Sequence, residues 1–147
     1  MNLLSLCRRP VVAIDEKASL VEAARRMREH HVGALVVTTQ GPQGTWVSGI
    51  VTDRDIVIDG LAVPARGAQA QVGALATKPI VSVAHDATAA DAIAAMAGAG
   101  VRRLLVVDAK GHLTGIVSID DLLATFARDA AGLAEALRVG AQHEASA

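Results

Sequence analysis

Aromatic side chains are almost missing from this chain of 147 residues: it has one tryptophan, Trp46, one phenylalanine, Phe126, and no tyrosine. A planar ligand would therefore have to be held by aliphatic side chains and by the backbone, because few rings are available to stack on it. Cysteine occurs once, at Cys7, which excludes an intrachain disulfide and favours a reducing, cytoplasmic environment.

Neither sign of charge is in excess, since 14 Lys and Arg residues face 15 Asp and Glu residues, for a net charge of −1. This balance does not favour a nucleic-acid partner, which requires a basic surface. No apolar run approaches the roughly 18 residues of a membrane span. In the first ten residues the charges follow a short apolar stretch, the reverse of a secretory signal. We therefore expect a cytoplasmic protein without nucleic-acid or membrane partners.

Histidine spacing gives no indication of a metal site. The histidines do not pair four residues apart, and none joins a cysteine or an acid in a recognised ligand motif. We therefore expect no metal. The five histidines are His30, His31, His85, His112 and His143.

An internal repeat organises most of the chain. The segment RRPVVAIDEKASLVEAARRMREHHVGALVVTT (8–39) aligns with TKPIVSVAHDATAADAIAAMAGAGVRRLLVVD (77–108), and the alignment continues from Gly49 onto Gly115. A period of this length predicts two copies of one structural unit, each too small to bury its apolar surface alone. The expected organisation is repeat 1 at 3–58, a linker at 59–71, repeat 2 at 72–124 and a tail at 125–147.

Each copy is expected to form a strand, a helix, two further strands and a second helix. The first helix of each copy is expected to bury one apolar face, formed by Leu20, Ala23, Ala24 and Met27 in the first copy and by Ala89, Ala92, Ile93 and Met96 in the second. Capping motifs are expected before the first helix of each copy, with Ser19 and Glu22 stronger than Thr88 and Asp91. The fold class is α/β (α+β), with two pseudo-symmetric repeats packed into one module. The expected strands are 11–14, 34–38 and 47–51 in the first copy and 80–83, 104–107 and 113–117 in the second.

The tail places Phe126, Ala130, Leu133 and Leu137 at spacings of four, three and four residues, which predicts an apolar stripe on a helix. Two interpretations are open: the helix folds back on its own module, or it packs on a second chain. Fraying is expected after Gly140, and the linker is expected to be exposed to solvent.

The chemistry-bearing motif is GIVTDRDIV (49–57), which returns as GIVSIDDLL (115–123). A hydroxyl followed three residues later by an acid is the usual start of a helix, so Thr52 with Asp55 and Ser118 with Asp121 are explained by capping alone. The same groups can also bind a ligand, because a hydroxyl bonds a phosphate or ribose oxygen and a carboxylate accepts from ribose hydroxyls. Both interpretations remain open from the residues.

Together with the preceding hairpin and the strands VGALVV and VRRLLVV, this motif resembles the tandem cystathionine-β-synthase (CBS) domain family, whose paired repeats form a Bateman module. The resemblance covers residues 3 to about 124. The sequence VTDRDIV and the short length look like those of free-standing bacterial members, which carry no attached enzyme. It implies a regulatory module that binds an adenosyl ligand between the repeats, and a homodimer.

The resemblance implies two ligand sites, each drawing on both repeats. In site one, adenine is held by aliphatic residues, ribose by a hydroxyl and a carboxylate, and phosphate by arginines: Ile50, Thr52, Asp55, Ile80, Val81, Arg102 and Arg103. Site two follows the same plan with Val11, Val12, Arg54, Ile116, Ser118 and Asp121.

The two implied sites differ in charge. Gly33 and Ala34 occupy the positions that match Arg102 and Arg103, so site two lacks the basic pair and depends on Arg54. Asp120, the counterpart of Arg54, opposes the arginines of site one. Site one is therefore expected to bind a phosphorylated ligand more tightly.

Three function classes compete. The leading hypothesis is a non-catalytic sensor of AMP, ADP, ATP or S-adenosylmethionine that needs no cofactor and regulates an unknown protein. The alternative is a ligand-free interaction or dimerisation module. An enzyme is the weakest hypothesis, because Asp120 and Asp121 have no accompanying nucleophile and the sequence has no dinucleotide or phosphate-loop motif.

Overall fold

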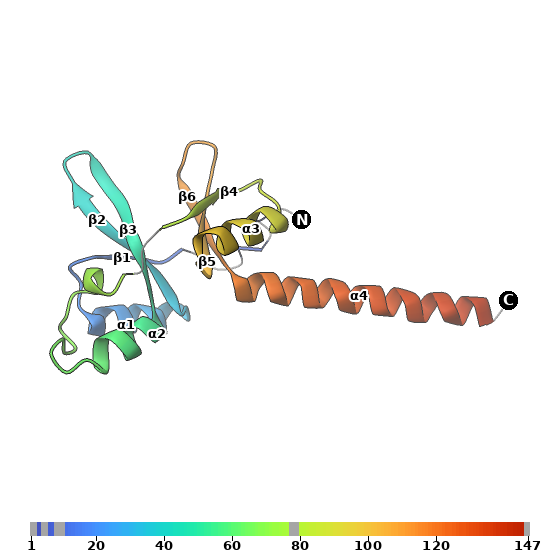
Figure 1. Ribbon diagram of the computed structural model, residues 1–147, viewed down its shortest axis with the longest axis horizontal. Coiled ribbons are helices and arrows are strands. Elements are labelled where there is room, and N and C mark those ends of the chain that lie inside the picture. The colour runs from blue at the N-terminus through green and yellow to red at the C-terminus, as the bar shows by residue number, and fades with distance from the viewer. Residues whose placement is uncertain (1–2, 4–5, 8–10, 77–79, 146–147) are drawn as a thin grey trace. The chain divides into compact units, whose positions relative to one another are not determined.

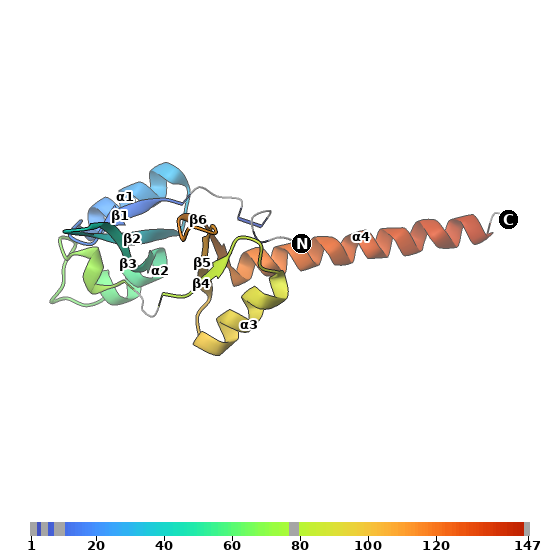
Figure 2. The same cartoon turned by 90° about the horizontal axis from the view of Figure 1, so that it is seen from above.

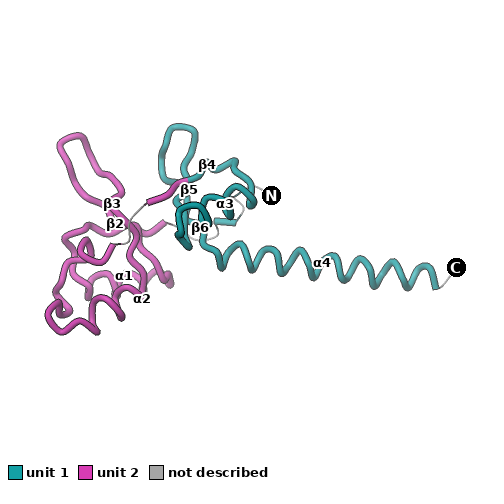
Figure 3. The backbone as a smooth tube through the Cα atoms, in the orientation of Figure 1, with its two compact units in different colours: residues 1–8, 83–147 teal, residues 9–82 magenta. Residues whose placement is uncertain are grey.

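The computed structural model describes residues 3, 6–7, 11–76 and 80–145. The chain divides into two compact units, coloured separately in Figure 3: unit 2 comprises Arg9–Ser82, and unit 1 comprises Met1–Arg8 with Val83–Ala147. Each described unit is built around a three-stranded sheet. The expected α/β class, with two similar repeats, is confirmed.

Unit 2 contains β1 (Ala13–Asp15), α1 (Leu20–His30), β2 (Ala34–Gly41), β3 (Gly44–Thr52), α2 (Asp53–Asp55), a π-helical turn η2 (Ile56–Leu61) and a 3-10 turn η3 (Val72–Ala74). The strand order is β1-β2-β3 (Figure 1), with β1 parallel and β3 antiparallel to β2. The β2–β3 hairpin is longer than predicted, since its ladder continues to the Gly41–Gly44 pair. Val51 and Thr52 therefore end a long, well-paired strand that fixes where α2 begins.

The core of unit 2 lies between α1 and the sheet. Leu20, Ala23 and Met27 of α1 are buried and belong to one apolar cluster with Leu35 and Val51. Burying an aliphatic side chain of this size stabilises the fold by about 1.5–3 kcal/mol.

Unit 1 repeats the plan. Its first strand is β4 (Ser82–Ala84), which begins at the last residue of unit 2, and it is followed by α3 (Ala89–Ala99), β5 (Arg103–Val107), β6 (Leu113–Ser118) and α4 (Ile119–Ala145). The sheet order is β4-β5-β6, with β5 and β6 antiparallel. Figure 2 shows β4, β5 and β6 beside α3. Leu104 and Val106 of β5 and Val117 of β6 are fully buried.

Several predicted details are wrong. The first strand of each unit begins at Ala13 or Ser82, two residues later than expected, because the β1–β2 ladder starts at the Ala13–Val36 pair. Ala24 and Ile93, at matching positions of α1 and α3, were expected on the buried face but are exposed. The buried stripe is therefore narrower than the apolar spacing predicts, and comprises only Leu20, Ala23 and Met27 in α1 and Ala92 and Met96 in α3.

The capping motifs have the opposite strength from that expected. Thr88 and Asp91 form a complete capping box, in which each backbone N–H is bonded by the other residue's side chain. Ser19 accepts from the Glu22 N–H at 3.2 Å, but the Glu22 carboxylate bonds Arg25 and Arg26 instead of returning to Ser19. A carboxylate with two arginines three and four residues along the helix is drawn toward them.

The tail is one helix with the end of repeat 2. α4 spans 27 residues, and its described residues after Thr125 are exposed. Fraying after Gly140 is not observed, because the helix continues to Ala145 through good helix formers such as Ala141 and Gln142. Of the predicted linker 59–71, residues 61–69 are exposed as expected. Its start is wrong, because residues 59–61 belong to η2 and Gly60 is buried, and Ala70 near its end is half-buried. Over the described ranges, no helix combines the length and apolar character that crossing a bilayer requires.

Candidate functional site

The junction between β3 and α2 holds the first hydroxyl–carboxylate pair. The Thr52 hydroxyl accepts from the Asp55 N–H at 3.1 Å, and Asp55 Oδ2 accepts from the Thr52 N–H at 2.8 Å. Thr52 is buried, with 8% of its surface exposed, and Asp55 is half-buried. The pair is therefore a true capping box, as one interpretation of the sequence expected.

The junction between β6 and α4 repeats this arrangement in unit 1. Asp121 Oδ2 accepts from the Ser118 N–H at 2.8 Å, and the Ser118 hydroxyl oxygen accepts from the Asp121 N–H at 3.2 Å. Each helix start is also tied to the strand across the sheet: the Asp53 N–H donates to the Gly33 carbonyl at 3.1 Å, and the Ile119 N–H donates to the Arg102 carbonyl at 3.0 Å.

Each capping carboxylate uses one oxygen for the cap. Among the residues that the structure describes, no hydrogen bond reaches Oδ1 of Asp55 or of Asp121. An ionised carboxylate accepts several hydrogen bonds, so the second oxygen remains able to accept from a ligand. Capping and ligand binding therefore do not exclude one another.

The backbone at α2 does not offer a phosphate site of its own. The N–H groups of the three residues of α2 are all engaged, by the Gly33 carbonyl, by Asp53 Oδ1 and by the Thr52 hydroxyl. The positive end of this helix is thus already satisfied within the protein. Any phosphate at this junction would have to be bound by side chains.

The arginine pair differs between its two members. Arg103 is half-buried in β5 directly opposite Ser118 of β6, so the two side chains share a face of the sheet. Arg102 is 73% exposed and lies 3.8 Å from the equally exposed Asp120 carboxylate. Asp120 therefore forms an ion pair with Arg102, and its negative charge offsets the positive charge of that arginine.

Unit 2 has no basic counterpart at this position among its described residues. Ala34 lies opposite Thr52 in the β2–β3 ladder, where unit 1 has Arg103 opposite Ser118. A side chain at the preceding residue is also restricted, because a Cβ on Gly33 would lie 3.2 Å from Asp53 Oδ2. Arg54, in the first turn after β3, is exposed.

The predicted adenine-contacting residues lie at several depths. Ile50 is buried in β3 beside Val36, whose N–H donates to the Val12 carbonyl at 2.9 Å. Val12 is part of the core cluster of unit 2. The half-buried residues are Val11, Ile80, Val81 and Ile116.

Cys7 contributes to the electrostatics of the β6–α4 junction. Burial raises the pKa of the Cys7 thiol, and the negative charge of Asp121 raises this pKa further. The thiol packs against β6, where a Cβ on Gly115 would lie 2.8 Å from its Sγ. Glycine at this position is what allows the cysteine to approach the strand.

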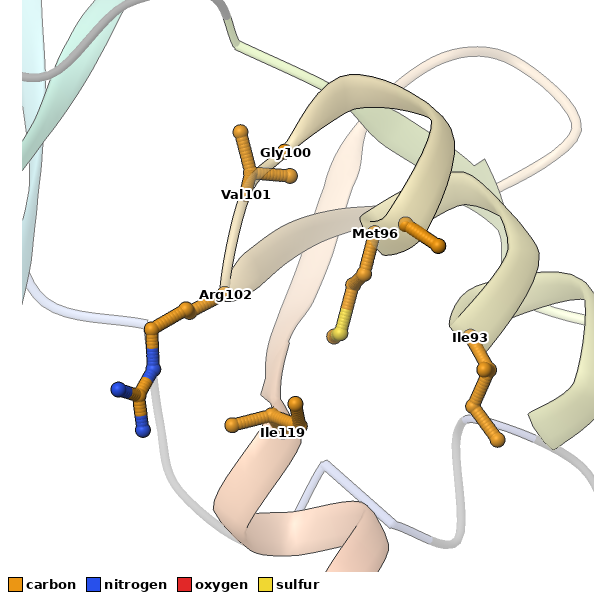
Figure 4. A pocket seen from close by; sticks show the side chains of 7 residues that line it. Ile93, Met96, Gly100, Val101, Arg102 and Ile119 are labelled. Carbon is orange, nitrogen blue, oxygen red and sulfur yellow. The ribbon is translucent and has the colours of Figure 1, made fainter.

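Sequence reasoning missed an apolar pocket of about 240 Å³ in unit 1, between α3 and the start of α4 (Figure 4). Met96 and Ile119 point toward each other across it, while the guanidinium of Arg102 points away. The exposed position of Ile93, which the sequence placed in the core, creates one wall. The lining residues are Ile93, Met96, Ala97, Gly100, Val101, Arg102 and Ile119. Within the described ranges, no group of three or more His, Cys, Asp or Glu residues could hold a metal ion.

Comparison with known families finds the same repeat. The model of the CBS domain matches residues 4–58 and again residues 72–128. Hypoxic response protein 1 of Mycobacterium tuberculosis is 36% identical over 112 residues, which are 76% of each chain. An uncharacterized protein of Methanopyrus kandleri, MK0525, is 31% identical over 80% of this chain, and the match spans only 59% of that relative's length.

Solved structures have the same fold. The CBS-domain protein ATU1752 of Agrobacterium tumefaciens superposes with a TM-score of 0.69 at 31% identity, over 85% of this chain and 98% of that one. The CBS-domain protein PAE2072 of Pyrobaculum aerophilum, in complex with AMP, superposes with a TM-score of 0.66 at 27% identity, over 82% and 89%. Hypoxic Response Protein I, with two coordinated zinc ions, gives a TM-score of 0.65 at 30% identity, over 84% and 98%.

Proposed function

The chain belongs to the CBS-domain family, and from this premise we propose that it is a non-catalytic regulatory module that binds an adenosyl ligand. The candidates are AMP, ADP, ATP and S-adenosylmethionine. The bound ligand acts as a signal and needs no further cofactor. A similar protein, PAE2072, has been solved with AMP, which supports an adenine nucleotide as the first candidate.

The observation that carries this proposal is the repeated strand–helix junction. Thr52 with Asp55 and Ser118 with Asp121 present the same geometry in both units, and each aspartate keeps one oxygen outside its cap. In this proposal the Oδ1 atoms of Asp55 and Asp121 accept from the ribose hydroxyls. A carboxylate suits that role because it accepts and never donates when ionised.

The other proposed roles follow the family plan. Aliphatic residues hold adenine: Ile50, Ile80 and Val81 in site one, and Val11, Val12 and Ile116 in site two. Arg102 and Arg103 bind phosphate in site one, and Arg54 does so in site two. In site one side chains must supply this charge, because the N–H groups of α2 are already engaged.

A ligand-free interaction module is the second candidate function. It is favoured by the fact that both hydroxyl–carboxylate pairs are fully explained as helix caps. It is also favoured by exposed apolar residues on α4, among them Leu133 and Leu137. Under either function we propose a homodimer, because an exposed apolar stripe of this kind marks an interface between proteins.

Thermal-shift screening tests the proposed function. AMP, ADP, ATP, S-adenosylmethionine and NAD are added separately to the wild type and to the Asp55→Ala/Asp121→Ala double variant. A ligand that binds only the native state raises its melting temperature. We expect at least one adenosyl compound to raise the melting temperature of the wild type. The same compound should leave the melting temperature of the folded double variant unchanged. No shift with any compound would support the interaction module instead.

A further inference from the structure

One face of α4 carries an unbroken apolar line, here called the α4 seam. Large side chains on it are well exposed: Leu123 to 61%, Phe126 to 45%, Leu133 to 69% and Leu137 to 76%. Ala130 and Gly140 continue the alternating spacing of three and four residues. That spacing is the 3.5-residue repeat of a helix that packs along another helix.

Most of the seam lies where α4 has no support from its own unit. The last buried residue of the helix is Thr125, and the 20 residues from Phe126 to Ala145 extend for about 30 Å with every side chain exposed. Helices of this length gain most of their stability from packing an apolar face. The seam therefore lacks the partner that its residue pattern requires.

We propose that the seam is covered by the same seam of a second copy, running antiparallel, with the two-fold axis between Ala130 and Leu133. This inference rests on the proposed homodimer and specifies its interface. In this register Ala130 faces Leu133 of the second copy, Phe126 faces Leu137, and Leu123 faces Gly140. Each contact occurs twice, as a two-fold axis requires.

Side-chain size favours the antiparallel register. In two of the three residue pairs of this register, a leucine lies opposite a small residue, Ala130 or Gly140. Large and small side chains therefore alternate across the seam, as close packing requires. A parallel pair would instead stack Phe126 on Phe126 and leave voids where Ala130 meets Ala130 and Gly140 meets Gly140. It would also bring the two Glu144 carboxylates together at the next position of the repeat, where like charges repel.

The small residues beside the seam allow the helices to approach closely. Ala127 and Ala134 lie next to each other across the proposed axis, and Ala136 flanks the opposite side. Charged side chains near the middle of the helix, Arg128 and Glu135, lie away from the seam. Asp129 also flanks the seam beside Ala130. The proposed register places it nearly level with Ala136 of the second copy, so no like charge meets it on this flank.

The pocket in unit 1 extends the same surface. Ile119, which lines the pocket beside Met96, occupies the seam position one turn before Leu123. In the proposed register the turn from Gly140 to Ala145 of the second copy lies beside Ile119. The residue of the second copy opposite Ile119 is Glu144, so the end of that helix meets the edge of the pocket through the aliphatic part of a side chain whose carboxylate faces solvent.

The first test is the oligomeric state of two charge variants, measured by light scattering at micromolar concentration with circular dichroism as the check on folding. Leu133→Glu places a charge on the seam, and Ala131→Glu places the same charge on the exposed opposite face. We expect a dimer for the wild type and for Ala131→Glu, and a folded monomer for Leu133→Glu. A monomeric wild type would contradict the homodimer itself, whereas a dimer that survives Leu133→Glu would contradict only the seam.

The second test fixes the direction of the helices by spin-label distances. Cys7→Ser removes the only native thiol, and cysteines introduced one at a time at Ala131 and Ala145 carry the label on the same helix face. In the antiparallel register the labels at 131 are at the same level along the axis, separated only by the width of the helix pair, whereas the labels at 145 are about 40 Å apart along the axis. Short distances at both positions would show a parallel pair and overturn the proposal. Labels that interact at neither position, including those of a helix folded back on its own chain, would overturn it as well.

Discussion

Three aspartates, Asp55, Asp91 and Asp121, begin helices with the same pair of hydrogen bonds to the preceding hydroxyl residue. The cap of Asp91 begins after a turn, whereas the caps of Asp55 and Asp121 begin at Thr52 and Ser118, the last residues of β3 and β6. The difference in function proposed for these residues therefore rests on their surroundings and not on the cap. A capping box read from a sequence identifies the residues but leaves open whether their second oxygen meets a ligand.

Cys7 is expected to react slowly with thiol reagents. Burial and then the charge of Asp121 raise the pKa of its thiol, so the reactive thiolate is scarce at neutral pH. The rate of modification by a chromogenic disulfide, measured against pH, should rise at higher pH than for a free cysteine.

Asp121→Asn provides the matched control for this effect. It removes the charge with little change of shape, so the pH profile of Cys7 modification should move to lower pH. An unchanged profile in the Asp121→Asn variant would show that Asp121 does not act on the thiol.

The raised pKa of Cys7 also predicts how the stability of the fold depends on pH. A group whose pKa is higher in the folded than in the unfolded state contributes less to the free energy of unfolding as the pH rises between the two values. The free energy of unfolding should therefore fall above the ordinary cysteine pKa.

Hairpins and helix faces explain how much of the fold the sequence could predict. Continuous apolar runs located β2 and β5, since strands buried on both faces must be apolar throughout. The glycine-containing turn that follows each of these runs located the hairpin partners β3 and β6. The onset of β1 and β4 was predicted two residues early, because apolar residues that precede a ladder look the same as residues within it. Ile93 was assigned to the core for a similar reason: helical spacing does not reveal how wide the covered face is, so the pocket that Ile93 borders was missed.

The cap of α3 gives a prediction at the scale of one element. Hydrogen bonds from the Thr88 side chain and backbone lower the pKa of Asp91 below the ordinary aspartate value. The cap therefore adds stability above the ordinary pKa, and this contribution is lost as pH falls through the lowered folded pKa. NMR titration should find Asp91 ionised at a pH where a free aspartate is protonated.

Thr88→Val removes the hydroxyl while keeping the side-chain shape. It should return the pKa of Asp91 toward the ordinary value. The pKa of Asp108, lowered first by the backbone N–H of His112, should stay low in the same variant and serves as its control. If Asp91 still titrates at the wild-type position, the hydroxyl is not the cause.

Across the whole molecule the repeats share one plan but carry different charges. Arg103 stands opposite Ser118 where Ala34 stands opposite Thr52, and Arg102 is paired with Asp120. The Arg102–Asp120 pair is exposed and contributes at most about 1 kcal/mol, so it leaves Arg102 able to turn toward a phosphate. The asymmetry was visible in the sequence. The packing of the two repeats decides which proposed site the arginines serve. The spacing of residues along the sequence does not determine that packing.

The two proposed sites should therefore bind AMP unequally. Charge-assisted bonds to a phosphate are each worth about 1.5–3 kcal/mol where water is excluded, so the site with two arginines should bind at least tenfold more tightly. In calorimetric titration, Arg102→Ala/Arg103→Ala should lose the tighter event and Arg54→Ala only the weaker one. The reverse pattern would show that the sites are assigned the wrong way round.

The central claim is that Asp55 is both a helix cap and a ligand-binding residue. Its most direct test is AMP calorimetry together with urea unfolding on three proteins: the wild type, Asp55→Ala and Asp91→Ala. Both variants lose a capping box of the same geometry, and Asp55→Ala should lower the free energy of unfolding by about 0.5–2 kcal/mol. The account predicts that Asp55→Ala also weakens AMP binding by about 1.5–3 kcal/mol, because a charged acceptor is lost, while Asp91→Ala binds AMP like the wild type. Equal AMP affinity in all three proteins, with the two variants merely less stable, would contradict it.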